Sequence, residues 1–212
     1  MIIPAILEKT FNGFEEQINK LPFSSIIQID VMDGEFVDNK SFEEIEKIDN
    51  LKLSHEWELH LMVNHPLQAI DKWKKIKNIK RVIFHIESED HPQEVIKKIK
   101  ENHWQVGIAI NPETDNSEVL PYISQIDEVL FMTVHPGQQG ASFLPEMKEK
   151  IMTMKKLLET KNADVIIAAD GAIKKNNIQE IKNWGVENFC IGSAVTLAPN
   201  PKEAYEELLK LI

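Results

Sequence analysis

The sequence has little cysteine, little arginine and no long apolar run, and each of these shortages disfavours some classes of protein. A single cysteine, Cys190, excludes an internal disulfide framework. Arginine occurs once, at Arg81, and the net charge of −10 disfavours nucleic acid or an anionic membrane as a partner. No apolar run approaches the roughly 20 residues that cross a bilayer, and no secretory signal opens the chain. The sequence therefore predicts a cytoplasmic protein and leaves the oligomeric state open, a homo-oligomer included.

Short apolar segments rich in β-branched residues alternate with longer amphipathic segments along the chain. The short segments have the length of buried strands, and the longer ones carry apolar residues at helical spacing. Strand followed by helix, repeated eight times, implies parallel strands joined by crossover helices. The expected strands cover residues 2–7, 25–31, 57–63, 81–87, 105–110, 128–134, 164–169 and 187–191.

Helix-start signals fit this alternation. Ser41 and Asp115, each followed three residues later by glutamate, have the form of capping boxes, and Pro66 and Pro92 suit first helical turns. Eight units favour one α/β domain over residues 1–212, a (β/α)8 TIM barrel. An open doubly wound sheet is the alternative, but the sequence has no G-x-G-x-x-G motif after its first strand.

In a (β/α)8 barrel, catalytic groups lie at the carboxyl ends of the strands. Alternation turns Gln28, Asp30 and Met32 of the second strand to the inner face, and it turns His60 of the third strand inward. One such residue alone is usually a cap or a loop contact, but Asp30, His60 and Asp170 would surround one cavity. A buried carboxylate pair without arginine is costly. We therefore expect either a bound cation or one protonated carboxyl.

Motifs at these strand ends match those of one known family, in order and along nearly the whole chain. One is segment 29–34, which carries Asp30 and is followed by Phe36 and Val37, and the matches are specific only when taken together. The other matching segments are 4–7, 60–62, 85–87, 111–112, 132–137 with Gly140, Ser142 and Phe143, 169–171 and 192–194.

These segments resemble the ribulose-phosphate 3-epimerase family, whose (β/α)8 barrels convert ribulose 5-phosphate to xylulose 5-phosphate. The resemblance implies that Asp30 and Asp170 transfer the protons at C3. It implies one divalent metal ion (Zn, Fe, Mn or Mg) that stabilises an enediolate, held by Asp30, His60 and Asp170 with Gln28 as a weak ligand. It also implies a sugar phosphate as partner, bound by Met32, Met62, Met132, Gly137, Gly140, Gly171, Ala172, Gly192 and Ser193.

Some positions depart from the family's pattern. Gln28 stands where the family has a ligand histidine, and an amide oxygen is a weaker and harder ligand than imidazole. Ala172 stands where the family has a glycine, and it strains or crowds the phosphate site if that position needs a positive φ. The remaining departures are Ala5, His135, Gln138, Gln139 and Ala141.

The departures leave alternatives open. One is a divergent barrel that binds a sugar phosphate without epimerase activity. Another is an epimerase for a different ketose phosphate, such as allulose 6-phosphate. A third is a decarboxylase or lyase of the same fold, in which a lysine commonly stands beside an aspartate at a strand end. The sequence disfavours this third class, because no lysine falls at the ends of the second, third and seventh strands.

Overall fold

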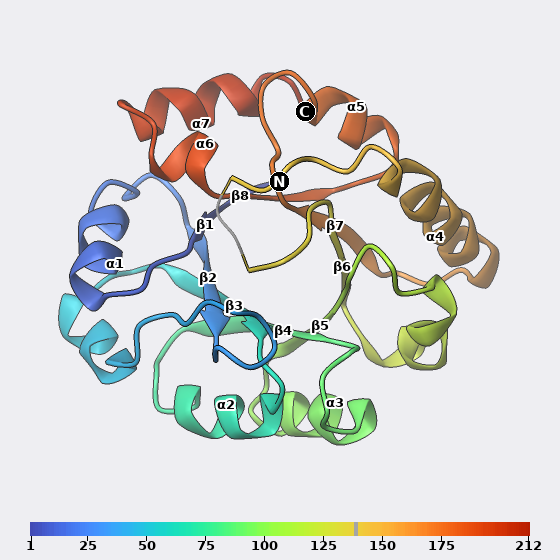
Figure 1. Ribbon diagram of the computed structural model, residues 1–212, viewed down its shortest axis with the longest axis horizontal. Coiled ribbons are helices and arrows are strands. Elements are labelled where there is room, and N and C mark those ends of the chain that lie inside the picture. Colours follow the sequence, from blue (N-terminus) through green and yellow to red (C-terminus); the bar gives the residue numbers. More distant parts are fainter. Residues whose placement is uncertain (138–139) are drawn as a thin grey trace.

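The computed structural model describes residues 1–137 and 140–212, which contain a closed parallel barrel (Figure 1). Within those residues, eight strands pair in chain order, and the last pairs with the first. This topology confirms the predicted (β/α)8 fold and excludes the open doubly wound sheet. The predicted strands differ from the observed ones only at their ends. The strands are β1 Ile2–Ile6, β2 Ile26–Met32, β3 Glu56–Met62, β4 Ile79–His85, β5 Gln105–Ile110, β6 Glu128–Met132, β7 Ile166–Asp170 and β8 Asn188–Ile191.

Helices surround the barrel and form its outer layer (Figure 1). In the described part of the chain, no helix has both the length and the apolar character needed to cross a membrane. The α-helices are α1 Phe11–Ile18, α2 Pro66–Trp73, α3 Pro92–Glu101, α4 Met147–Lys161, α5 Ile178–Asn183, α6 Ser193–Thr196 and α7 Pro201–Leu209, and the 3-10 helices are η1 Ile45–Leu51, η2 Asn116–Glu118 and η3 Leu120–Gln125.

The helix-start signals in the sequence are mostly confirmed. Pro66 and Pro92 occupy the first turns of α2 and α3. Asp115 caps through its side chain as predicted, although the helix it caps is the short η2. The predicted capping box at Ser41 is wrong. The Ser41 hydroxyl instead accepts a hydrogen bond of 3.1 Å from the backbone N–H of Met32, so it holds the chain against the end of β2.

Strand side chains alternate between two apolar layers. Ile83 and Leu130 lie inside the barrel, together with Cys190, which is buried on a strand as the sequence predicts. Ile27 and Ile29 of β2 lie in the outer layer, between the barrel and the helices. Each such side chain contributes roughly 1.5–3 kcal/mol by leaving water. The predicted alternation of β2 is therefore confirmed, and it leaves the polar residues of that strand facing inward.

The floor of the barrel is a buried ionic cluster around the only arginine of the sequence. Arg81 Nη1 donates hydrogen bonds of 2.6 Å to Glu58 Oε2 and to Glu128 Oε2. Burial and the charge of Glu128 raise the pKa of Glu58 to about 8, although Arg81 opposes the shift. Burial also raises the pKa of Glu128, but Arg81 and a hydrogen bond from the Asn188 amide oppose this shift. One guanidinium thus faces two buried glutamates, and Glu58, whose pKa is about 8, is mostly protonated at neutral pH.

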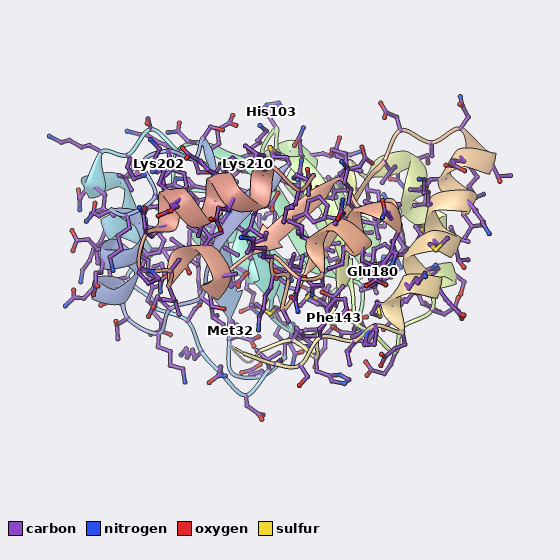
Figure 2. All side chains as sticks on the ribbon, turned by 90° about the horizontal axis from the view of Figure 1, so that it is seen from above. Met32, His103, Phe143, Glu180, Lys202 and Lys210 are labelled. Atoms are coloured by element: carbon purple, nitrogen blue, oxygen red, sulfur yellow. The ribbon has the colours of Figure 1, made fainter. Side chains whose placement is uncertain are left out.

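The two ends of the barrel are formed by different segments of the protein. Met32 at the end of β2 and Phe143 before α4 lie at one end of the molecule, and His103 before β5 lies at the other (Figure 2). The first of these is the carboxyl end of the strands, where barrel enzymes hold their catalytic groups.

Candidate active site

A cavity opens at the carboxyl end of the barrel, and three polar side chains on the inner strand faces form part of its wall. They are Asp30 from β2, His60 from β3 and Asp170 from the end of β7. The structure thus brings together the three residues that the sequence analysis placed around one cavity. The predicted substrate residues that line the same cavity are Met62, Met132, Gly137, Gly140, Gly171, Ala172, Gly192 and Ser193.

Met32 is placed differently from Met62 and Met132, the other two methionines that the resemblance implies bind the substrate. Of the hollows formed by the described residues, it lines one between the ends of β2 and β3, with Ser41 and Trp73. Met32 is the last residue of its strand, where the chain turns towards Ser41. Inner-face alternation does not fix the direction of a side chain at such a point. Contact between Met32 and the substrate therefore stays a prediction.

Asp30 and Asp170 converge on one nitrogen of His60. His60 Nδ1 lies 3.3 Å from Asp30 Oδ1 and 3.4 Å from Asp170 Oδ2. Burial alone would lower the pKa of His60, but the hydrogen bonds to Asp170 and Asp30 outweigh it and raise this pKa to about 9. Burial raises the pKa of Asp30; the hydrogen bond to His60 opposes this shift, and the charge of Asp170 adds to it. Without a bound cation, a protonated His60 therefore partly balances the two carboxyl groups.

Gln28, two residues before Asp30 on β2, forms hydrogen bonds with both carboxyl groups. Its Nε2 donates hydrogen bonds of 2.8 Å to Asp30 Oδ1 and 2.6 Å to Asp170 Oδ2. These are the same two oxygens that face His60 Nδ1. The sequence predicts a cation or a protonated carboxyl at this point. It does not predict that a neutral amide can also bridge two carboxylates, because the sequence does not reveal which way an amide points.

The residues of this cluster fit a divalent ion. The ligand atoms of Asp30, His60 and Asp170 all lie within 4.8 Å of one another. Gln28 Oε1 is buried and has no hydrogen-bond partner among the described residues. A half-turn of the amide therefore costs only the two bonds of Nε2, and it turns Oε1 towards the other three ligands. Two carboxylates, one imidazole and one amide oxygen form a set suited to Mn²⁺, Mg²⁺, Zn²⁺ or Fe²⁺.

Behind His60 lies a pair that the sequence analysis matched as a motif without giving it a role. His85 Nε2 lies 2.9 Å from His60 Nε2, and His85 Nδ1 lies 3.3 Å from Glu87 Oε2. Burial lowers the pKa of His85 to about 4; Glu87 opposes this shift, and His60 adds to it. His85 is therefore neutral. The signal available in the sequence was the two-residue spacing of His85 and Glu87 at the end of a strand.

The loops after β7 and β8 form the other side of the cavity. Gly171 has φ +123°, and a Cβ atom there would lie 2.5 Å from Val134 Cγ2, so no larger residue fits. Ala172 has φ 50°, in the left-handed region that favours glycine, and it strains the backbone in the way the sequence suggested. Lys174 also lines the cavity and places a cationic side chain beside the predicted phosphate loops. The pattern of residues at strand ends does not predict Lys174, because it lies in the loop beyond β7.

The remaining departures from the family's pattern are distributed unevenly. Ala5 and Ala141 line the cavity, as Ala172 does. His135 is exposed, and its Nδ1 lies 3.1 Å from Glu113 Oε1. Gln138 and Gln139 lie outside the described residues.

Comparison with known sequences decides the family. The model of the ribulose-phosphate 3 epimerase family matches residues 1–196. The chain belongs to the ribulose-phosphate 3-epimerase family. The ribulose-phosphate 3-epimerase of Escherichia coli strain K12 is 29% identical over an alignment of 212 positions, which covers 98% of this chain and 94% of that protein. The enzyme of that name from Buchnera aphidicola subsp. Acyrthosiphon pisum is 30% identical over an alignment of 213 positions, which covers 99% of this chain and 93% of that protein.

Membership confirms the predicted family and enzyme class, an isomerase that acts on carbohydrate phosphates. Solved structures agree on the fold. 3-Hexulose-6-phosphate synthase from Salmonella typhimurium superposes with a TM-score of 0.70 at 15% identity, covering 99% of this chain and 97% of that one. Thiamine phosphate pyrophosphorylase from Pyrococcus furiosus gives 0.66 at 19% identity, with 99% and 94% covered. At these identities the likeness shows the barrel alone.

Proposed function

We propose that this protein epimerises a ketose phosphate at the carbon beside its carbonyl, converting ribulose 5-phosphate to xylulose 5-phosphate. The observation that carries the proposal is the convergence of Asp30 and Asp170 on His60 Nδ1 and Gln28 Nε2, at the carboxyl end of the barrel. Two carboxyl groups that reach one point from different strands suit proton transfer on two faces of one carbon.

In the proposed reaction, one ionised carboxylate removes the proton from C3. The other carboxyl group carries a proton and delivers it to the opposite face of C3. Which of Asp30 and Asp170 plays each part depends on the direction of the reaction. The configuration inverts, and the enzyme has gained one proton and lost one. A raised pKa of Asp30 favours this exchange, because proton transfer is most efficient when the pKa lies near the working pH. Asp30 is only 8% exposed, which limits loss of the proton to water.

A divalent ion held by Asp30, His60 and Asp170, with Gln28 as a weak fourth ligand, supplies when bound the positive charge that stabilises the enediolate. Until an ion binds, the Gln28 amide keeps the two carboxylates together through Nε2. Ion binding must displace these two hydrogen bonds, so we expect a lower affinity than with a histidine at this position.

The substrate's ends are held by other parts of the cavity. Met62 and Met132 offer apolar surface beside the reacting carbon. Backbone N–H groups at 171–172 and at 192–193 suit a phosphate, and Lys174 adds a cationic side chain on the same side. A phosphate fixed there orients C3 between the two carboxyl groups.

Solvent exchange tests the proposal. The protein is incubated with ribulose 5-phosphate in D2O, with Mn²⁺, Zn²⁺ or Fe²⁺, and deuterium at C3 and xylulose 5-phosphate are followed by NMR. We expect both to appear, and Asp30→Asn and Asp170→Asn each to abolish the epimer while leaving the far-UV circular dichroism unchanged. Full activity in the double variant would refute the two-aspartate mechanism.

One observation favours a second function, a barrel that binds a sugar phosphate without epimerising it. The Gln28 amide already bridges the two carboxylates, and an amide that stayed there would keep an ion out. The same experiment separates the two functions. A sugar phosphate that binds without exchange under any ion supports the binding protein, and exchange with allulose 6-phosphate alone supports the other epimerase.

A further inference from the structure

A chain of three buried or half-buried side chains runs from the loop after β4 to the carboxylate cluster. It begins at Glu87, passes through His85 and ends at His60, which faces Asp30 and Asp170. His85 and His60 are fully buried, and their rings stack with centroids 5.1 Å apart. The proposed reaction gives His85 and Glu87 no part.

The hydrogen-bond chemistry of this chain fixes where its protons lie. A carboxylate only accepts, so His85 Nδ1, which faces Glu87 Oε2, carries a proton. A neutral His85 then has a bare Nε2, which accepts. The proton in the 2.9 Å contact between the two rings therefore belongs to His60 Nε2. Without an ion, His60 also carries a proton on Nδ1, and this proton faces the two carboxylates. A cation that displaces it leaves the proton on Nε2 in place and meets a bare Nδ1.

Glu87 is itself held in one orientation. Its Oε1 accepts a hydrogen bond of 2.8 Å from the backbone N–H of Asn111 at the end of β5, and it also accepts one from the Thr114 hydroxyl. The hydroxyl can donate or accept, whereas the backbone N–H can only donate. The side of Glu87 that faces Asn111 must therefore be an acceptor, and Oε2 is left for His85.

We infer that Glu87 and His85 are positioning residues, which set the tautomer of His60 so that a bare Nδ1 faces Asp30 and Asp170 as a ligand for a cation. The inference rests on the proposed ion site. The opposite tautomer would point an N–H at that site and exclude the ion. Outer-shell partners of ligand histidines typically change metal affinity by about 10- to 100-fold, because they fix the ring and raise its basicity.

The decisive variant is Glu87→Gln, which keeps the size of the side chain. It reverses the direction in which the hydrogen bonds from residue 87 through His85 to His60 are donated. Its carbonyl oxygen must face the Asn111 N–H, so its amide N–H2 faces His85 Nδ1. His85 Nδ1 then becomes the acceptor, the proton between the rings moves to His85 Nε2, and His60 carries its proton on Nδ1. We expect the Mn²⁺ dissociation constant, measured by titration calorimetry, to rise by about 10- to 100-fold.

Thr114→Val is the matched control. It removes the second hydrogen bond to Glu87 Oε1 and loosens the same side chain. It leaves unchanged the direction in which the hydrogen bonds between Glu87, His85 and His60 are donated. Its Mn²⁺ affinity is expected to stay close to the wild-type value. An equal loss in both variants would mean that Glu87 matters only for packing and would overturn the inference, as would an unchanged affinity in Glu87→Gln.

A second measurement does not depend on the variant folding. In wild-type protein loaded with Zn²⁺, long-range ¹H–¹⁵N correlation spectra identify the protonated nitrogen of each ring. We expect His60 Nε2–H and His85 Nδ1–H, and the reverse assignment, or failure to bind any ion, would overturn the inference. A protein that binds ions in the expected way but does not epimerise ribulose 5-phosphate would refute the proposed function and leave the inference standing.

Discussion

The proton on Glu58 in the barrel floor predicts an unusual dependence of stability on pH. The pKa of Glu58 is about 8 in the folded protein, against 4.5 for an ordinary glutamate. Between these values the folded state binds one more proton at this site than the unfolded state does. The free energy of unfolding therefore falls as the pH rises through this window. From pH 6 to pH 8, this one group removes about 2 kcal/mol of stability.

Glu58→Gln isolates this contribution, because the amide has the size of the protonated carboxyl and does not titrate. The free energy of unfolding is measured by urea denaturation at pH 6 and at pH 8. We expect the variant to lose about 2 kcal/mol less than the wild type between the two. Titrating groups that do not interact with Glu58 cancel in the comparison, so the difference reports Glu58 together with its coupled neighbours Glu128 and His60.

Glu56→Gln is the control for this experiment. Glu56 lies on the same strand and pairs with Lys80 at 2.7 Å, but its side chain is 49% exposed. Its substitution is expected to leave the wild-type pH dependence unchanged. If Glu58→Gln and the wild type lose the same stability between pH 6 and pH 8, Glu58 is ionised in the folded state and the account of the floor is refuted.

Three further substitutions test the active-site end. Gln28→His is expected to tighten Zn²⁺ binding in a calorimetric titration, because imidazole replaces an amide that must turn; an unchanged affinity would place position 28 outside the ligand set. Ala172→Gly removes a side chain from a residue at φ 50° and is expected to raise the free energy of unfolding by about 1 kcal/mol in urea; a loss of stability would contradict the assigned strain. Lys174→Met is expected to raise KM for the sugar phosphate and leave kcat nearly unchanged, and a fall in kcat alone would remove Lys174 from phosphate binding.

The barrel and the convergence of Asp30, His60 and Asp170 were predictable, because both follow from local patterns. Alternation along a strand decides which side chains face inward, and parallel strands in a barrel bring their carboxyl ends together. Met32 shows where this reasoning stops. Alternation places it on the inner face, but as the last residue of β2 it lines a different hollow.

The floor could not be predicted, because it depends on register between strands. Arg81 was recognisable as the only arginine, at the start of an expected strand. Its partners Glu58 and Glu128 come from β3 and β6, and the pairing of β3 with β4 shifts register between Trp57 and Glu58. Such an irregularity follows from packing across the whole barrel. The orientation of the Gln28 amide is set in the same way, by neighbours brought from β7.

The inner face of β3 has a consequence for how reliably this protein assembles. Glu58, His60 and Met62 occupy successive inward positions on this strand, so one strand supplies the floor, the carboxylate cluster and the cavity wall. A slip of one residue would turn Leu59 and Leu61 inward and would turn the three inward-facing side chains outward. Arg81 would then lose Glu58 at the moment the cluster lost His60. A slip of β3 is therefore penalised at the floor as well as at the active site, so the ionic floor also guards the register that places His60.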